Sequence, residues 1–315
     1  MTRPEEAAAL VPPSFRVSVR QLSAEDGRVG GPSGAEWEAG LPRLLAQVLD
    51  DWGLEPTGDL GRVGQSAVVV PVARAAEPLA LKVVWPHFEA RDEPLVLRHW
   101  DGRGAVRLVA ADPGRGALLL EALDPTRDLR ALDIDAACTV VGSLLRQLNV
   151  AAPPGLRLLS AHAREELATL AGTEGVLPRR MLERLTGLVR DLTADVACDA
   201  TLVHTDLHYE NVLASRAGAG RQPWLAIDPH AMAGHPGVEV QPLLRNRVGE
   251  YGTGSAFRWQ VRRRLEVACE AAGIDEDVAL AWSYVVTAMQ AGWAAEKGDA
   301  DLVSFNIALL KALNG

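Results

Sequence analysis

Three polar side chains stand at fixed spacing in the stretch Leu202-Val203-His204-Thr205-Asp206-Leu207-His208-Tyr209-Glu210-Asn211-Val212-Leu213. His204 is followed two residues later by Asp206, and Asn211 comes five residues after that. Mostly apolar triplets on either side predict short buried strands, which places the polar residues on the connection between them. A polar β-hairpin in which Asp and Asn serve the turn would also explain this spacing.

A further aspartate follows the next strand-like run. Asp228 comes directly after Trp224-Leu225-Ala226-Ile227 and precedes a proline. Phosphoryl transfer by a kinase needs a carboxylate beside the attacking hydroxyl, and an amide plus a carboxylate to hold Mg²⁺ on the nucleotide phosphates. Asp206 has the position of the first group, and Asn211 and Asp228 have the positions of the other two. This order of loop, strand and aspartate favours a kinase over a simple polar hairpin.

Length and composition limit the possible functions. The 315 residues allow about two structural units, and the 48% of apolar residues argue against disorder. The net charge of −9 disfavours a nucleic-acid or anionic-membrane partner and is compatible with a cationic small substrate. The three cysteines are far apart, which predicts neither a disulfide framework nor a metal site. With no apolar signal core and no membrane-spanning run, we expect a cytoplasmic protein.

The first third of the chain predicts a small lobe after an irregular arm. Residues 1–34 are rich in Pro, Gly and charge, and we expect them to be irregular. Apolar residues at helical spacing over 41–52 predict a helix that ends at Gly53. Two runs at 66–72 and 79–84 predict a β-hairpin. Residues 35–123 therefore form a small antiparallel sheet with few helices, which we expect to bind a nucleotide.

Lys82 is the most informative residue of this predicted lobe. It lies between Leu81 and Val83, where a buried ammonium is costly unless it meets an anion, although an exposed strand face would explain it equally well. A helix predicted over 92–100, with proline at its first turn, offers Glu93 as the partner, and Glu89 competes for that place.

Other segments of this lobe are candidate nucleotide contacts. The turn at 58–64 carries three glycines whose backbone N–H groups could cover phosphates, although such turns are ordinary. Ser66 begins the first strand of the hairpin. After two more strands at 106–111 and 117–120, the segment from Glu121 to Leu123 leaves the sheet, and the backbone of this hinge could bind adenine.

The remainder of the chain, residues 124–315, predicts a second, mostly helical lobe. Helices are expected at 134–148, 162–170, 178–197, 257–272, 277–295 and 302–313. The predicted architecture is therefore α+β and bilobal, as in protein kinases, with a nucleotide in the cleft and the catalytic loop and acceptor site in the second lobe.

The chain resembles the aminoglycoside phosphotransferases, and within them the aminoglycoside 6-phosphotransferase (streptomycin 6-kinase) and hydroxyurea phosphotransferase group. The resemblance covers most of the chain from about residue 35. The stretches that carry it are 81–83, 97–102, 106–108, 118–121, 204–214, 224–229 and 242–247.

This resemblance implies a role for each matching residue. Asp206 would accept or orient the proton of the acceptor hydroxyl. Asn211 and Asp228 would hold Mg²⁺ on the phosphates, and Lys82 would contact the α- and β-phosphates. His204 would be structural, fixing the loop by hydrogen bonds.

The sequence also departs from the family pattern. His235 and Glu239 stand where the family commonly has aspartates, and Glu239 could still anchor the loop. The segment Trp293-Ala294-Ala295-Glu296-Lys297 lacks two acids of the family's Trp-Asp-x-Glu-Asp. We therefore expect an acceptor less cationic than streptomycin, or one with an anionic group. His208 and Glu210 line the catalytic loop, and solvated turn residues would look the same.

The predicted activity is an ATP-dependent O-phosphotransferase, with GTP as the alternative nucleotide. Its acceptor would be the hydroxyl of a small molecule, an aminoglycoside or another sugar-containing antibiotic, as in a resistance kinase. Hydroxyurea, a simple sugar and an amino sugar are the alternative acceptors. A kinase-like binding protein without catalysis is disfavoured, because Lys82, Asp206, Asn211 and Asp228 are all present.

Overall fold

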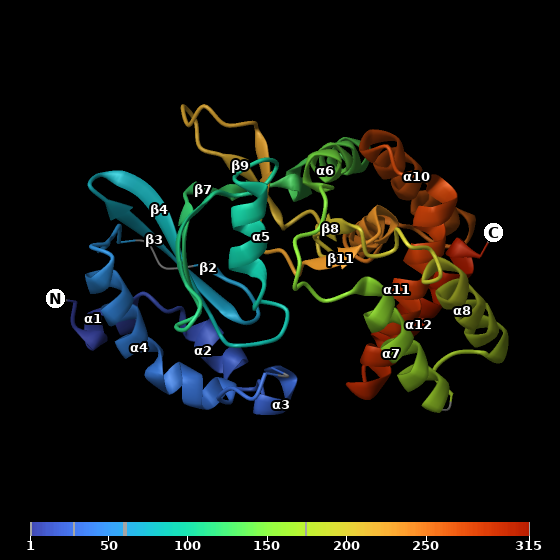
Figure 1. The fold of residues 1–315 in the computed structure, drawn as a ribbon, viewed down its shortest axis with the longest axis horizontal. Helices are drawn as coiled ribbons and strands as arrows, with labels where there is room; N and C mark the ends of the chain where they lie inside the picture. Colours follow the sequence, from blue (N-terminus) through green and yellow to red (C-terminus); the bar gives the residue numbers. More distant parts are fainter. Residues whose placement is uncertain (1, 28, 59–61, 174, 315) are drawn as a thin grey trace. The chain divides into compact units, whose positions relative to one another are not determined.

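A computed structural model describes residues 2–27, 29–58, 62–173 and 175–314. The chain forms two compact units (Figure 1). Unit 1 contains Met1–Asp124 and Ala214–Pro223, and unit 2 contains Pro125–Leu213 and Trp224–Gly315. The first boundary lies one residue from the expected position, whereas the return of residues 214–223 to unit 1 was not expected.

The amino-terminal segment is helical rather than irregular. It forms α1 (Pro4–Ala9), α2 (Pro13–Val19) and α3 (Ala24–Gly27). Proline begins α1 and α2, where the missing N–H costs nothing because the first turn has no partner for it. Phe15 and Val19 are fully buried. The expectation of an irregular arm was wrong because its prolines start helices here instead of breaking them.

A longer helix, α4 (Gly34–Asp51), follows. Ser33 accepts a hydrogen bond from the backbone N–H of Glu36, whose carboxylate accepts one in return from Ser33, and this capping box fixes the helix start. Gly53 adopts a positive φ of 60° after the last turn, as expected for the residue that ends the helix. The helix therefore begins earlier than its apolar spacing predicted and ends where predicted.

The sheet of unit 1 is antiparallel and six-stranded, in the order β1-β3-β4-β6-β5 with β2 paired to β3. The strands are β1 (Glu55–Pro56), β2 (Arg62–Val63), β3 (Ala67–Arg74), β4 (Glu77–Val84), β5 (Leu108–Asp112) and β6 (Ala117–Glu121). Leu79, Leu81 and Val83 share one core with leucines of α4. Because side chains alternate along a strand, Lys82 points to the opposite face. The helix α5 (Glu93–Trp100) lies beside the sheet (Figure 1).

Two strands of a second sheet contain the points at which the chain leaves one unit and enters the other. This sheet has the order β10-β9-β7 and contains β7 (Leu123–Asp128), β9 (Val212–Ser215) and β10 (Trp224–Ala226). The connection between β9 and β10 belongs to unit 1. Arg221 on that connection donates to the carbonyls of Gly102 at 2.7 Å and Ala105 at 3.1 Å, and it pairs with Glu121 at 3.0 Å.

Unit 2 is mostly helical. Its strands β8 (Thr201–Val203) and β11 (Met232–Gly234) form an antiparallel pair. Its helices are α6 (Ile134–Leu148), α7 (Leu159–Gly172), α8 (Arg179–Leu192), α9 (Gln241–Leu244), α10 (Ser255–Ala272), α11 (Glu276–Glu296) and α12 (Ala300–Leu313), with short 3₁₀ turns η1 (Leu129–Ala131), η2 (Pro236–Val240) and η3 (Val248–Glu250). Within the described residues, no helix is both long and apolar enough to cross a membrane.

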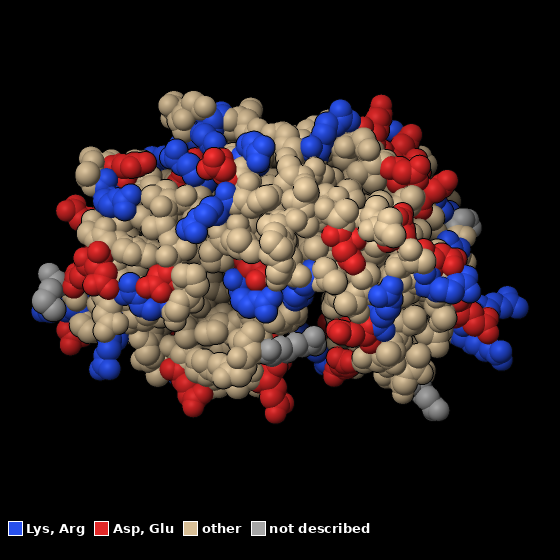
Figure 2. Space-filling model, viewed as in Figure 1, with Lys and Arg blue, Asp and Glu red and all other residues tan. Residues whose placement is uncertain are grey.

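Charged side chains of both signs are interspersed on the face shown in Figure 2. The net charge of −9 is therefore not gathered into one acidic field on this face.

Candidate active site

Lys82 and Glu93 form a buried ion pair in unit 1. The Lys82 Nζ lies 2.7 Å from both carboxylate oxygens of Glu93. The two residues are only 5% and 1% exposed. The structure thus selects Glu93 over Glu89 as the partner and removes the alternative of an exposed strand face. A buried ammonium with a bidentate carboxylate is satisfied, and it is held at a fixed place on the sheet.

The hinge candidates Glu121 and Leu123 lie at the end of β6 and the start of β7. The Glu121 carboxylate accepts a 2.7 Å hydrogen bond from the backbone N–H of Arg107 and pairs with Arg221. The Glu121 side chain therefore already has partners within unit 1. A nucleotide at this point would be bound by the backbone instead.

Ser66 directly precedes β3, and its carbonyl accepts a 2.7 Å hydrogen bond from the N–H of Trp85. The glycine-bearing turn at 58–64 lies partly outside the described residues, because 59–61 are not described. Ser66 and this turn remain predictions as nucleotide contacts.

In unit 2, both carboxylate oxygens of Asp206 are held, one by the catalytic loop itself and one by Arg245 from a distant segment. The Asn211 Nδ2 donates to the Asp206 carbonyl at 2.9 Å and to its Oδ2 at 3.0 Å. The guanidinium of Arg245 donates to Oδ1. Two imidazoles lie close to Oδ2, that of His208 at 3.7 Å and that of His230 at 4.0 Å. The structure thus brings Asp206 and Asn211 together, as their spacing predicted.

His204 links this loop to the strand end that carries Asp228. Its Nδ1 accepts the backbone N–H of Asp206 at 3.3 Å, so its Nε2 carries the proton and donates to the Ile227 carbonyl at 3.0 Å. Complete burial, more than any neighbouring charge, lowers the pKa of His204 to about 3. The imidazole is therefore neutral near pH 7 and acts through these two hydrogen bonds.

Glu239 anchors the backbone of the same loop. Its two carboxylate oxygens accept hydrogen bonds from the backbone N–H groups of His204 at 2.5 Å and Thr205 at 2.9 Å. Thr205 has a positive φ of 61°, which is costly for a β-branched residue and needs such support. Glu239 is fully buried, and this burial raises its pKa to about 7. The longer glutamate thus occupies the anchoring position expected of an aspartate.

Asp228 is joined to the loop by backbone hydrogen bonds. The N–H of Ile227 donates to the Asn211 carbonyl at 2.9 Å, and the N–H of His230 donates to the His204 carbonyl at 3.1 Å. Asp228 itself has a positive φ of 57°, an uncommon conformation for a non-glycine residue and one that clusters at functional sites. The strand end and the catalytic loop are thus connected on both sides of Asp228.

Asn211 and Asp228 carry the chemical groups that could hold a hard divalent cation. Since the Asn211 Nδ2 is used by Asp206, its Oδ1 is the atom left for a ligand. An amide oxygen and a carboxylate suit Mg²⁺, which is bound by few protein groups and completes its shell with phosphates and water. In the part of the chain that the structure describes, no three His, Cys, Asp or Glu side chains gather as metal ligands.

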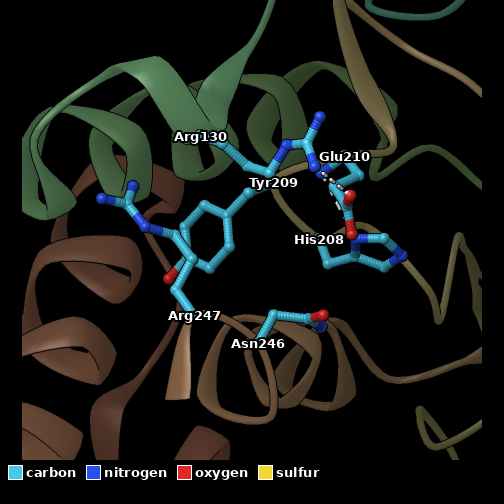
Figure 3. A pocket seen from close by; sticks show the side chains of 6 residues that line it. All are labelled: Arg130, His208, Tyr209, Glu210, Asn246 and Arg247. Carbon is cyan, nitrogen blue, oxygen red and sulfur yellow. Dashed lines mark hydrogen bonds and ion pairs between the residues drawn. The ribbon is translucent and has the colours of Figure 1, made fainter. Parts of the chain in front are cut away.

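His208 and Glu210 line a cavity of about 230 Å³ beside the loop (Figure 3). The cavity is also lined by Arg130, Tyr209, Asn246 and Arg247. Glu210 pairs with Arg130 at 2.8 Å, and the Arg247 guanidinium lies 5.2 Å from the Tyr209 ring.

The His208 Nδ1 accepts the Glu210 N–H at 3.3 Å, and burial lowers the pKa of His208. The side chain of His208 is only 16% exposed. His208 is therefore largely shielded, whereas the Glu210 side chain is 50% exposed and lies in a turn, as expected for a solvated turn residue.

Sequence reasoning missed Arg245 and His230 as neighbours of Asp206. Arg245 lay within a family-like stretch, but an arginine 39 residues along the chain carries no signal of its partner. His235 is a different case, because it serves as a helix cap. Its Nδ1 accepts the N–H of Gly237 at 3.0 Å at the start of η2, as an aspartate there would.

Solved structures of kinases are among those with a similar fold. A choline/ethanolamine kinase family protein from Mesorhizobium loti superposes with a TM-score of 0.57 over 82% of this chain and 87% of its own, at 15% identity. A similarity at this identity shows the fold alone. It confirms the predicted α+β, bilobal, kinase-like architecture.

Sequence relatives are much closer. The hydroxyurea phosphotransferase of Kitasatospora aureofaciens is 40% identical over 297 residues, which cover 91% of this chain and 83% of that protein. The streptomycin 6-kinase of Streptomyces glaucescens is 36% identical over 301 residues, which cover 93% of this chain and 96% of that protein.

The family model for aminoglycoside/hydroxyurea antibiotic resistance kinases matches residues 51–298. This match spans the ion pair of unit 1 and the whole catalytic loop of unit 2. The resemblance inferred from the motifs is confirmed, and so is the prediction of a phosphotransferase. The chain belongs to the aminoglycoside/hydroxyurea antibiotic resistance kinase family.

Proposed function

We propose that this protein transfers the γ-phosphoryl group of ATP, or of GTP, to a hydroxyl group of a small antibiotic-like acceptor. The observation that carries the proposal is Asp206, held by Asn211 and Arg245 on a loop that Glu239 anchors. Unit 1 would bind the nucleotide, and unit 2 would supply the catalytic loop and the acceptor site.

Asp206 would act on the acceptor hydroxyl. The hydroxyl oxygen forms a bond to the γ-phosphorus while the bond from that phosphorus to the bridging oxygen of the β-phosphate breaks. The proton of the hydroxyl passes to the Asp206 carboxylate, or is oriented by it. A carboxylate offers about four lone-pair sites, so about two remain after Arg245 and Asn211 have taken one each, and one of these can serve the acceptor.

Asn211 and Asp228 would hold Mg²⁺ through the amide oxygen and the carboxylate. The cation would neutralise charge on the nucleotide phosphates, a large part of catalysis in reactions with a loose transition state. Lys82, fixed by Glu93, would contact the α- and β-phosphates. These residues would supply position and charge rather than covalent chemistry.

The acceptor belongs to one of two chemical classes, a sugar-containing antibiotic such as streptomycin or the much smaller hydroxyurea. Ala294, where the family commonly has aspartate, is 2% exposed, so no carboxylate stands at this point. The neighbouring Trp293 donates from its Nε1 to Glu166 at 2.7 Å, which uses a nearby acid internally. The absence of two family carboxylates from the segment 293–297 supports an acceptor less cationic than streptomycin.

The cytoplasm is the compartment that we propose for this reaction. The three cysteines, Cys138, Cys198 and Cys269, are free thiols and are all buried. Free thiols suit a reducing environment, in which structural disulfides do not form.

A phosphoryl-transfer assay tests the proposal. The protein is incubated with Mg²⁺, labelled ATP or GTP, and separately with hydroxyurea, streptomycin, other aminoglycosides and simple sugars. Mass spectrometry then measures whether an acceptor gains the mass of one phosphoryl group. Asp206→Asn protein is the matched control. If no acceptor gains phosphate in the parent protein, or if the control is equally active, the proposed function is wrong.

A further inference from the structure

The segment around Arg245 needs its own support, because it supplies a partner of Asp206 from a distant part of unit 2. It runs from α9 into η3, and Arg247 within it has a positive φ of 54°. An irregular segment of this kind leaves backbone carbonyls without a helical partner. The position of Arg245 therefore depends on what binds those carbonyls.

Arg264 on α10 binds three backbone carbonyls of this segment. Its Nη1 donates to the carbonyls of Asn246 at 2.8 Å and Leu243 at 3.4 Å, and its Nη2 donates to the carbonyl of Arg247 at 3.2 Å. The hydroxyl of Tyr251 donates to the remaining neighbour, the Leu244 carbonyl, at 2.6 Å. The carbonyls of the two residues before Arg245 and the two after it are thus all held.

Burial of the charged Arg264 guanidinium costs free energy. Arg264 is fully buried, and its Nε has no hydrogen-bond partner among the residues that the structure describes. Its carboxylate neighbour, Glu250, lies 3.8 Å away and is 45% exposed. The Tyr251 ring, 3.9 Å from the guanidinium carbon, adds a cation–π contact. A well-packed apolar residue of similar volume is often as good for stability as a buried charge, so packing alone does not account for an arginine here.

We propose that Arg264 is a positioning residue for phosphoryl transfer, which fixes the segment 243–247 so that Arg245 stays on Asp206. The inference rests on the proposed function, since it assigns Arg264 to the same catalytic carboxylate. Arg264 touches neither the carboxylate nor a reacting group in this structure. It acts through the backbone that carries Arg245. The planar guanidinium spreads five N–H donors over three nitrogens and can bind three carbonyls, whereas the three donors of a lysine ammonium all sit on one nitrogen.

Kinetics of Arg264→Lys provide the test, because this variant keeps the charge and loses the fork. We expect kcat to fall roughly 10- to 100-fold, as for a displacement of about 1 Å at a catalytic group, with the KM for nucleotide little changed. Arg262→Lys is the matched control. Arg262 lies two residues away on the same helix and also binds carbonyls, those of Ala312 at 3.3 Å and Leu313 at 3.4 Å, but at the end of α12.

A double-mutant cycle separates positioning from general stability. If Arg264 acts through Arg245, Arg264→Lys should cause no further loss of kcat in an Arg245→Met background. The proposal is overturned if the two losses multiply, if Arg264→Lys has the parent kcat, or if Arg262→Lys lowers kcat equally.

Hydrogen–deuterium exchange gives a readout that needs no acceptor. In Arg264→Lys, backbone amides of 204–211 and 243–247 should exchange faster, whereas Arg262→Lys should leave both segments as in the parent. Unchanged exchange in Arg264→Lys would refute the positioning role. Faster exchange without any phosphorylated acceptor would support that role and count against the proposed function alone.

Discussion

The two units fix their functional side chains in opposite ways. In unit 1, Lys82 pairs with Glu93, which lies eleven residues further along the chain. In unit 2, the Asp206 carboxylate is held by Asn211 and Arg245. His204 accepts the backbone N–H of Asp206, and Glu239 accepts the N–H groups of the two residues before it. One carboxylate thus depends on side chains from several separate segments.

This difference predicts different responses to mutation. Both side chains of an ion pair can be replaced together by apolar groups. The stability lost by replacing one of them can therefore be recovered by replacing the other. The partners of Glu239 are backbone N–H groups, which no substitution except proline removes. Damage to the catalytic loop should therefore spread through its shared hydrogen bonds and resist rescue.

The largest expected effect is on turnover. Asp206→Asn should fold, bind nucleotide and lose roughly 10²–10⁴-fold in kcat, because the amide cannot accept the hydroxyl proton. Steady-state kinetics measure the loss, and thermal stabilisation by Mg-ATP checks nucleotide binding. Turnover close to that of the parent protein would remove Asp206 from its role.

The ion pair of unit 1 should show the next largest effect, on stability. Lys82→Met leaves Glu93 buried without its ammonium and should lower the free energy of unfolding by about 3–5 kcal/mol. The double variant Lys82→Met/Glu93→Leu should recover most of this loss in urea unfolding. If the double variant loses as much free energy of unfolding as the two single variants together, the two side chains do not stabilise the protein as a pair.

Nucleotide binding should depend on Asp228 to a smaller extent. At a concentration 100 times its dissociation constant, Mg-ATP should stabilise the parent by about 2.7 kcal/mol. Asp228→Ala should lose much of this shift, and EDTA should remove a similar share from the parent protein. Equal stabilisation of the two proteins by Mg-ATP would exclude Asp228 as a metal ligand.

The smallest expected effect is a pH dependence from Glu239. Burial raises its pKa in the folded protein to about 7, from an ordinary value of 4.5. Between these values the folded state binds more protons than the unfolded chain, so this group makes stability fall as the pH rises from about 4.5 to 7.

Melting temperatures of the parent and of Glu239→Gln, measured from pH 5 to pH 8, test this dependence. The advantage of the parent over the variant should shrink as the pH rises, because glutamine does not titrate. A constant difference across this range would show that Glu239 keeps one protonation state.

The local elements were predictable because their signals are local. The helix predicted over 134–148 is found at Ile134–Leu148, where the Asp133 side chain accepts the N–H of Ala136 at 3.0 Å. Lys82 stood out as a charge in an apolar strand. The helix α8 was overpredicted by several residues, since it ends at Leu192 and the following residues form turns.

The rest of the site could not be predicted because its contacts join distant segments. Asp206 and Asn211 lie on one loop, so their spacing carried the prediction. Arg245 reaches Asp206 only through the fold, and Arg264 reaches the segment of Arg245 from another helix. Periodicity describes which face of an element is buried, but it does not state which polar groups will meet there.

The connection at residues 214–223 has a consequence for the order of synthesis. Unit 1 contains the first 124 residues and this later segment, whose Arg221 holds the Gly102 and Ala105 carbonyls. On a ribosome that adds about 5–20 residues per second, a nascent chain ending at residue 124 waits roughly 5–20 s for the missing piece. During this time, Glu121 lacks its arginine partner. The nascent amino-terminal part would then be an open intermediate, which chaperones or proteases could engage before the second half emerges.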